Sequence, residues 1–149
     1  MNIRWSCKHF RDLTPTELHR ILALRAAVFV VEQNCPYQDP DYKDENALHV
    51  SGWIGDEIVA CARILPAGVS YDEVSVGRVA TAGSVRGTGA GKQLMHKTME
   101  YLHEYFGQVP VRISAQSYLI RFYKTFGFEV TDKPEYLEDD IPHTEMLYK

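Results

Sequence analysis

Two adjoining stretches determine the fold that the sequence predicts: Val74-Ser75-Val76-Gly77-Arg78-Val79-Ala80-Thr81 and Arg86-Gly87-Thr88-Gly89-Ala90-Gly91-Lys92. The first alternates as a half-buried strand does. The second carries three glycines and is followed by apolar residues at helical spacing: Leu94, Met95, Met99, Leu102 and Phe106. A glycine-rich turn between a strand and a helix lets backbone N–H groups and the positive helix end approach an anion closely. These stretches therefore predict a site for a phosphate or pyrophosphate group.

Two common phosphate-binding patterns do not fit this loop. A Walker A loop ends in Gly-Lys-Ser/Thr, but Gln93 follows Gly91-Lys92, and Arg86 stands where its first glycine belongs. The dinucleotide pattern G-x-G-x-x-G fails because Lys92 or Leu94 takes the place of its last glycine. The pattern that remains is Arg-x-x-Gly-x-Gly. Its structural alternative is a glycine-rich turn without a ligand.

A second pattern follows in the C-terminal third of the chain. Residues 111–115 are typical of a buried strand, and Gln116 comes directly after them. Tyr123 lies seven positions after Gln116 and four before Gly127-Phe128. Together with the Arg86 loop, these residues resemble the GNAT acyltransferase superfamily, in which an Asn more often takes the place of Gln116. Two motifs in the right order are more specific than either one alone.

The order of expected elements predicts an α+β fold with a mixed, mainly antiparallel sheet flanked by helices. This order also resembles the GNAT-like acyl-CoA N-acyltransferase fold, and the resemblance covers residues 1–149 as a single domain. The expected strands are 3–8, 49–54, 57–65, 74–81, 111–115, 128–130 and 144–148. The expected helices are 15–29, the segment after the glycine loop, and 117–126, with a polar connection at 136–143.

A closer resemblance is to the ElaA-type branch of this superfamily. It rests on the stretch from Arg25 to Tyr37, which includes Phe29, Glu32 and Cys35, and on Asp41-x-x-Asp44. The same Arg and Asp spacings also resemble acyl-homoserine-lactone synthases, but the Arg86 loop and Tyr123 favour GNAT. Arg25 lies on an apolar helix face and needs an anionic partner, for which we expect Asp41 or Asp44. The acidic loop 30–45 is either a solvated connection or an acidic wall beside a cationic substrate.

Composition narrows the class of protein. The 149 residues suit one domain, and the net charge of −4 argues against a nucleic-acid partner. We find no stretch long enough to span a membrane and no apolar signal-peptide core. Cys7, Cys35 and Cys61 have neither disulfide nor metal spacing, so we expect a reducing cytoplasm and no metal. Covalent catalysis by cysteine is not favoured.

The GNAT resemblance implies acetyl-CoA as co-substrate and assigns roles to the motifs. The backbone of Val79, Ala80 and Thr81 is expected to pair with the pantetheine arm, near a backbone N–H that faces the thioester oxygen. The coenzyme-binding set is completed by Arg86, Gly87, Thr88, Gly89, Ala90, Gly91, Lys92 and Gln116. Tyr123 is the expected general acid, with a core tyrosine as its structural alternative. A phenol acts on a thiolate only if its pKa is lowered or the proton moves in concert.

The acceptor side is less determined by the sequence. A base must take the amine proton, and the candidates are Glu32, Glu73, His49 and His143, among which His143 is the most plausible histidine. Residues expected to contact the acceptor are Arg25, Glu32, Tyr37 and His143.

We therefore expect an N-acetyltransferase that acts on a primary amine of a small molecule or protein by direct attack in a ternary complex. The alternatives are transfer of a longer acyl group, as in acyl-homoserine-lactone synthases, a CoA-binding module without turnover, and a phosphate-binding domain unrelated to CoA. The sequence leaves a homodimer open.

Overall fold

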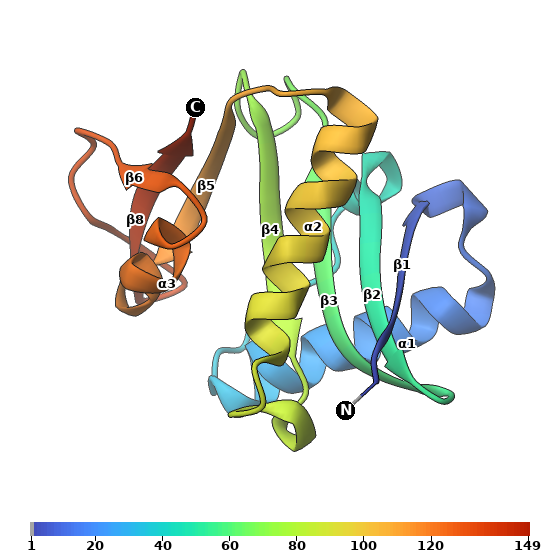
Figure 1. Cartoon of the computed structure of the whole chain (residues 1–149). Coiled ribbons are helices and arrows are strands. Elements are labelled where there is room, and N and C mark those ends of the chain that lie inside the picture. The colour runs from blue at the N-terminus through green and yellow to red at the C-terminus, as the bar shows by residue number, and fades with distance from the viewer. Residues whose placement is uncertain (1) are drawn as a thin grey trace.

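Within residues 2–149, which the computed structural model describes, eight strands form one sheet. Its order is β1-β2-β3-β4-β5-β8-β6, and β7 also pairs with β8 (Figure 1). Between described strands, β4 and β5 pair in parallel and the other pairs are antiparallel, which confirms the expected α+β fold. The strands are β1 (Arg4–His9), β2 (Leu48–Ile54), β3 (Glu57–Leu65), β4 (Val74–Thr81), β5 (Val111–Gln116), β6 (Phe128–Val130), β7 (Tyr136–Glu138) and β8 (Ile141–Tyr148).

The first helix begins at the predicted residue, Pro15. Thr14 Oγ1 accepts a hydrogen bond from the Glu17 N–H at 3.1 Å, and Glu17 Oε1 accepts one from the Thr14 N–H at 2.9 Å. This reciprocal capping box starts α1 (Pro15–Arg25). The sequence predicts one helix through residue 29, but Ala26–Glu32 continue as a π-helix. Three of its residues, Val28, Phe29 and Glu32, line a cavity between β4 and β5.

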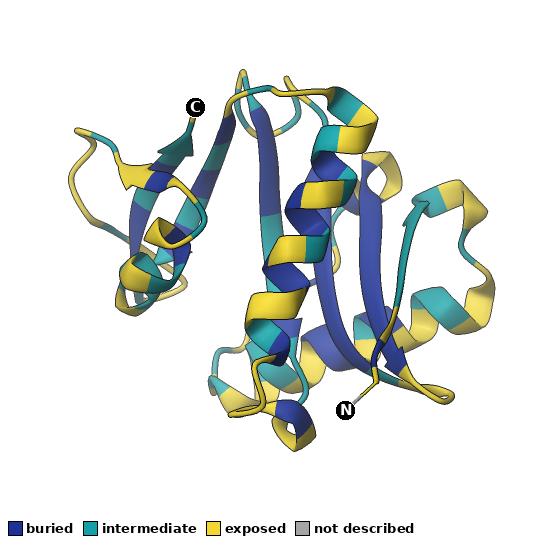
Figure 2. Cartoon of the chain, in the orientation of Figure 1, coloured by how far each residue is buried: buried dark blue, intermediate teal, exposed yellow. Residues whose placement is uncertain are grey.

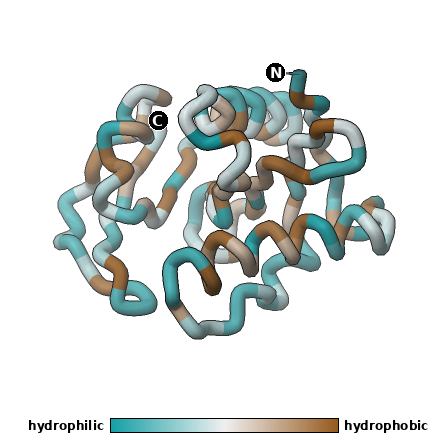
Figure 3. Tube along the Cα trace, turned by 90° about the horizontal axis from the view of Figure 1, so that it is seen from below, coloured by the Kyte–Doolittle hydropathy of each residue, from teal (hydrophilic) through white to brown (hydrophobic). Residues whose placement is uncertain are grey.

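Two helices cover opposite faces of the sheet. α2 (Ala90–Phe106) packs on one face and α1 on the other, as the views from the front and from below show (Figures 1 and 3). Successive side chains of a strand point to opposite faces. In β3, Ala62 and Ile64 therefore join the core under α2, whereas Cys61 packs against α1. β2 and β3 are consequently buried along most of their length (Figure 2).

β4 and β5 are joined at one end of the strands. Among described residues their ladder consists of the pairs Val74↔Val111 and Ser75↔Arg112. Beyond these pairs the strands diverge, and β5 runs on with β8 and α3 (Ile120–Lys124) as a separate wing (Figure 1). Beyond Ser75, the edge of β4 that faces β5 therefore has no strand partner within residues 2–149.

The polar connection expected at 136–143 is wrong, because this segment forms a hairpin. Residues Tyr136–Glu138 pair with the first half of β8. The turn is made by Asp139 and Asp140, whose φ angles are 52° and 63°. Aspartate tolerates this left-handed conformation better than most residues. The sequence lacks the Asn-Gly or Asp-Gly signal by which such turns are usually recognised.

The remaining helical segments are short. They are 3₁₀ turns at Phe10–Asp12, Tyr42–Asn46, Gly83–Val85 and Ser117–Leu119, the last of which leads into α3 in place of the longer helix expected at 117–126. No helix within residues 2–149 combines the length and the apolar character that crossing a membrane requires.

Candidate active site

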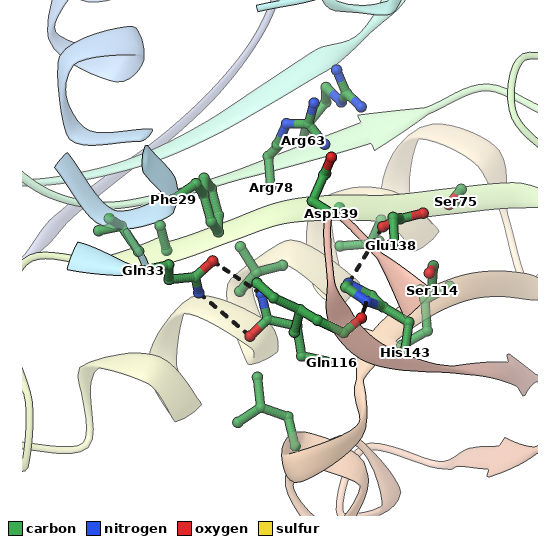
Figure 4. Close-up of a pocket in the computed structure, with 18 of the residues that line it drawn as sticks. Phe29, Gln33, Arg63, Ser75, Arg78, Ser114, Gln116, Glu138, Asp139 and His143 are labelled. Atoms are coloured by element: carbon green, nitrogen blue, oxygen red, sulfur yellow. Dashed lines mark hydrogen bonds and ion pairs between the residues drawn. The ribbon is translucent and has the colours of Figure 1, made fainter. Parts of the chain in front are cut away.

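A cavity of about 900 Å³ fills the space between β4 and β5. One wall is formed by residues 75–81 of β4, and the other by Ile113, Ser114 and Gln116 of β5. α2 and α3 contribute residues on one side of the sheet, and the π-helix and the β7–β8 hairpin contribute residues on the other (Figure 4). One cavity therefore connects the two faces of the sheet through the split.

The glycine loop forms the entrance to α2. Gly87 and Gly89 have φ angles of 79° and 88°, in the left-handed region that favours glycine. The first hydrogen bond of α2 runs from the Gln93 N–H to the Gly89 carbonyl at 3.1 Å, so the N–H groups of Ala90 and Gly91 point out of the helix end. These donors and the helix dipole can bind an anion.

Two predicted site residues pair with each other in this structure. Arg86 Nη2 donates to Glu32 Oε2 at 2.7 Å and to the Thr81 carbonyl at 2.8 Å. The hydrogen bond from Arg86 lowers the pKa of Glu32, so this carboxylate is ionised rather than ready to accept a proton at neutral pH. Elsewhere in the loop, the Thr88 hydroxyl donates to the Val85 carbonyl, and Lys92 is exposed.

A β-bulge lies in the middle of the β4 wall. Gly77 pairs with Arg63 and Ala80 pairs with Cys61, so Arg78 and Val79 together oppose one residue of β3. Arg78 has a φ angle of 50°, which is unusual for a residue with a side chain. The bulge therefore changes the direction of the β4 backbone beside the gap.

The side chain of Arg78 is held in place by the acidic loop. Its Nε lies 2.8 Å from Asp39 Oδ1, and its Nη2 donates to the Asp39 carbonyl at 2.9 Å. Its guanidinium also lies over the ring of Tyr37, 5.7 Å from the centroid. The Tyr37 hydroxyl donates to Asp39 Oδ1 at 3.0 Å. Tyr37 thus lines the cavity, as expected for an acceptor contact, while supporting the bulge.

Arg25, at the end of α1, holds the same loop through ion pairs. The expected partner Asp44 is confirmed, because its Oδ1 accepts from Arg25 Nη1 at 2.9 Å. Asp41 is wrong as the partner, because it pairs with Arg63 at 2.6 Å, and Asp39 accepts from Arg25 Nε at 2.9 Å instead. Arg25 is 1% exposed, so it holds the loop and does not reach an acceptor, which corrects its predicted role as a contact.

The acidic loop is therefore not an acidic wall. Burial opposes ionisation of Asp44, but hydrogen bonds and charges from Arg25 and Arg63 outweigh it and hold the pKa of Asp44 below its usual range. The network contains as many arginines as aspartates: Arg25, Arg63 and Arg78 with Asp39, Asp41 and Asp44. The sequence analysis missed Arg63, Arg78 and Asp39. Arginine inside an apolar strand was the signal that could have found the first two.

Tyr123 lies on the α2 and α3 side of the split. It is 7% exposed, lines the cavity, and packs edge-on against Phe122 and Phe128. Burial raises the pKa of its phenol to about 12. The phenol therefore carries its proton at neutral pH. A phenol with this pKa can act as a general acid only if its proton moves in concert with bond breaking, which is one of the two routes that the sequence left open.

Gln116 and His143 lie on the other side of the split. They are direct partners in the β5–β8 ladder, so their side chains share one face. The neighbouring Ala115 is buried in the same core as Tyr123, on the opposite face. The Gln116 amide exchanges hydrogen bonds of 3.4 Å with Gln33 from the segment after the π-helix (Figure 4). This contact ties Gln116 to the side of the cavity that holds His143.

His143 is oriented by its own backbone neighbourhood. Its Nδ1 lies 2.7 Å from the Ile141 carbonyl, which can only accept, so Nδ1 carries a proton. Nε2 lies 3.3 Å from Glu138 Oε2 (Figure 4). In the neutral ring, Nε2 is therefore the basic nitrogen. His143 is 7% exposed and lines the cavity.

The other base candidates lie elsewhere. His49 is 1% exposed, its Nε2 is 2.9 Å from the Asp44 carbonyl, and burial lowers its pKa. Glu73 accepts two hydrogen bonds from Arg112, at 2.9 and 2.8 Å. Neither residue belongs to the lining of the cavity. Within residues 2–149, no group of three or more His, Cys, Asp or Glu side chains could hold a metal ion.

Sequence and structure comparisons agree with this geometry. Residues 17–149 match the family described as Acetyltransferase (GNAT) domain. The chain is 45% identical over 147 residues to protein ElaA of Escherichia coli, covering 97% of this chain and 95% of that protein. The crystal structure of E. coli ElaA superimposes with a TM-score of 0.92, at 42% identity over 99% of this chain and 100% of that one.

Two further structures help to define the fold. The crystal structure of an acyl-CoA N-acyltransferase from Pseudomonas aeruginosa superimposes with a TM-score of 0.94, at 39% identity over 99% of this chain and 100% of that one. A CoA-dependent acyl-homoserine lactone synthase, BjaI, has a TM-score of 0.80 at 18% identity, over 98% of this chain and 82% of that one, which is a likeness of fold alone. The chain belongs to the GNAT acetyltransferase family.

Proposed function

We propose that this protein transfers an acetyl group from acetyl-CoA to a primary amine of a small molecule or peptide, by direct attack in a ternary complex. One observation carries the proposal. A single cavity joins the N-terminus of α2, the unpaired edge of β4, the buried phenol of Tyr123 and the imidazole of His143. These are the groups that donor binding, leaving-group protonation and amine deprotonation need.

In this proposal acetyl-CoA binds through its pyrophosphate and its pantetheine amides. The N–H groups of residues 87–92 bind the pyrophosphate at the end of α2. The free backbone edge of Val79, Ala80 and Thr81 pairs with the pantetheine amides as an added strand would. The bulge at Arg78 then brings a backbone N–H to the thioester oxygen, where it stabilises the developing oxyanion.

The chemistry requires two proton transfers on opposite sides of the sheet. The amine nitrogen attacks the thioester carbonyl carbon, the C–S bond breaks, and the departing sulfur takes the Tyr123 proton. Because burial raises the pKa of Tyr123 to about 12, this proton moves as the C–S bond breaks and not before. His143 Nε2 takes the proton of the attacking amine, and Glu138 stabilises the imidazolium that results.

The ion pairing of Glu32 and of the loop aspartates supports His143 as the base. Glu32 is ion-paired with Arg86, and the aspartates of the acidic loop are ion-paired with buried arginines. The contact between His143 Nδ1 and the Ile141 carbonyl sets the tautomer of the neutral ring, with the proton on Nδ1 and Nε2 left as the basic nitrogen. Gln33 and Gln116, which are hydrogen-bonded to each other, line the same cavity.

The proposal is tested by the release of free CoA thiol from acetyl-CoA in the presence of a library of primary amines. We expect amine-dependent release with at least one acceptor and formation of its N-acetyl product. Acetyl-CoA, propionyl-CoA and a branched-chain acyl-CoA are compared in parallel, because the apolar side chains of the cavity leave a longer acyl donor as the alternative. Binding of CoA without thiol release from any of these donors would contradict catalysis and favour a binding module.

A further inference from the structure

We infer that the acceptor amine also carries a carboxylate, and that this carboxylate binds to Arg63 in the empty space beside Gly77. The inference rests on the proposed function, because it names the acceptor class for the same cavity. It follows from an unmatched guanidinium, a missing side chain and a separation of charge across the cavity.

The guanidinium of Arg63 is only half used within the protein. Nη1 donates to Asp41 Oδ1 at 2.6 Å and to Asp44 Oδ1 at 2.9 Å. Nε is buried and has no hydrogen-bond acceptor among residues 2–149. Arg63 is 5% exposed and lines the cavity. A buried donor without an acceptor is unfavourable, so a ligand oxygen at Nε would stabilise this arrangement.

A carboxylate matches the unused side of the guanidinium. Nε and Nη2 present two parallel N–H donors, and a carboxylate presents two acceptor oxygens at the same spacing. A hydroxyl or a carboxamide oxygen can satisfy one of these donors but brings no charge. The side chain therefore selects a carboxylate over its neutral counterparts.

Gly77 provides the space for this group. It pairs directly with Arg63 in the β3–β4 ladder and lines the cavity. A Cβ at Gly77 would meet no described atom within 4 Å. Ser75, two residues earlier on the same strand and before the bulge, faces the same side and also lines the cavity. The volume that a side chain would fill thus lies on the face of the sheet that carries the side chains of Arg63 and Ser75.

The charges of the two rims have opposite signs. On the loop side the buried arginines and aspartates balance, and Lys43 adds a cation whose Nζ donates to Ser70 Oγ at 2.8 Å. On the hairpin side lie the carboxylates of Glu138 and Asp139, for which the ion pairs between described residues include no lysine or arginine, and Glu138 Oε2 lies 3.3 Å from His143 Nε2. A zwitterion with its carboxylate at Arg63 and its ammonium at Glu138 and His143 complements both rims. The acceptor class is therefore an amino acid or a close relative.

Matched acceptors test the inference directly. Each set contains a free amino acid, its primary amide and the amine that remains when the carboxylate is removed, and KM is compared because amine basicity mainly alters kcat. Loss of a charge-assisted pair predicts a KM about ten- to hundredfold higher for the amide and the amine than for the acid. Equal KM values across a set that is acetylated would overturn the inference while leaving the proposed function intact. Absence of turnover with every amine would contradict the proposed function itself.

A substitution at Gly77 tests where in the cavity the carboxylate binds. Gly77→Ala adds one methyl group in the empty space and leaves the Arg63 ion pairs in place, so the variant should fold. We expect KM for the amino acid to rise about tenfold while the Kd of acetyl-CoA stays unchanged. Gly83→Ala is the matched control, because a Cβ there also meets no described atom within 4 Å and the residue is not part of the lining. An unchanged KM in Gly77→Ala, or an equal loss of acetyl-CoA affinity, would overturn the placement.

Discussion

The two faces of the split sheet present different kinds of residue to the cavity. On the side of α2 and α3, the cavity meets a helix end, glycines and aromatic rings, among them Phe122 and Tyr123. On the side of α1 and the hairpin, it meets arginines, aspartates and His143. The side of α2 and α3 therefore presents backbone and apolar side chains to the cavity, whereas the side of α1 and the hairpin presents paired charges.

The charged residues and the aromatic residues hold different parts of the cavity in place. Asp39 joins Arg25 at the end of α1 to Arg78 at the β4 bulge, so the charged face fixes the β4 backbone beside the cavity. On the aromatic face, Tyr123, the proposed proton donor, has apolar neighbours. A change on the aromatic face should alter rate without stability, and a change in the charged network should alter stability first.

The largest effect is expected for Tyr123→Phe on the aromatic face. The ring and its packing are kept, and the proton for the leaving thiolate is lost. We expect kcat to fall by about 10²–10⁴, with little change in the Kd of acetyl-CoA or in the unfolding midpoint. The fall in kcat should be smaller for a thioester whose thiol is more acidic, because its thiolate leaves without a proton donor. Unchanged kcat with the best acceptor would make Tyr123 a packing residue.

The next effect is expected for Arg25→Ala on the charged face. Removing one partner of a buried ion pair leaves Asp39 and Asp44 undercompensated, which costs about 3–5 kcal/mol of unfolding free energy. Urea denaturation measures this change. Glu138→Ala is the control, because its exposed carboxylate should alter stability by no more than about 0.5 kcal/mol. If the two variants unfold alike, the contrast between buried and exposed charges is wrong.

A smaller effect on the unfolding free energy is expected when the pH is lowered. The pKa of Asp44 is lower in the folded protein than in the unfolded chain, so its ion pairs contribute stability above the unfolded pKa of about 3.9. This contribution is lost as the pH falls through the folded pKa. We therefore expect the difference in unfolding free energy between the parent and Asp44→Asn to shrink on acidification below about pH 4. A constant difference between pH 7 and pH 3 would show that Asp44 is not stabilised as an ion.

Local signals predicted much of the fold. The start of α1 at Pro15, the turn between the strands expected at 49–54 and 57–65, and the glycine loop before α2 all lie where the sequence predicts them. Each depends on neighbouring residues alone. The β7–β8 hairpin was missed because its turn depends on aspartates in a left-handed conformation that pairing with β8 stabilises.

The site was harder to predict than the fold because its charges pair across long sequence separations. Arg63 reaches Asp41, and Arg78 reaches Asp39, through a loop whose path the residues do not indicate. Alternation along β5 assigned Gln116 to the strand end but not to the face that it shares with His143. Ion pairing and facing depend on the register of the whole sheet, which local patterns do not contain.

The central claim is that an acyl-CoA binds in the split between β4 and β5 with its pyrophosphate at the start of α2. Calorimetric titration of acetyl-CoA into the parent, Gly91→Val and Gly83→Val tests it. Nothing described lies closer than 4.0 Å to a Cβ at Gly91, so the variant should fold while its side chain blocks the pyrophosphate. We predict binding by the parent and by Gly83→Val and none by Gly91→Val. Equal affinities in all three proteins would contradict the account.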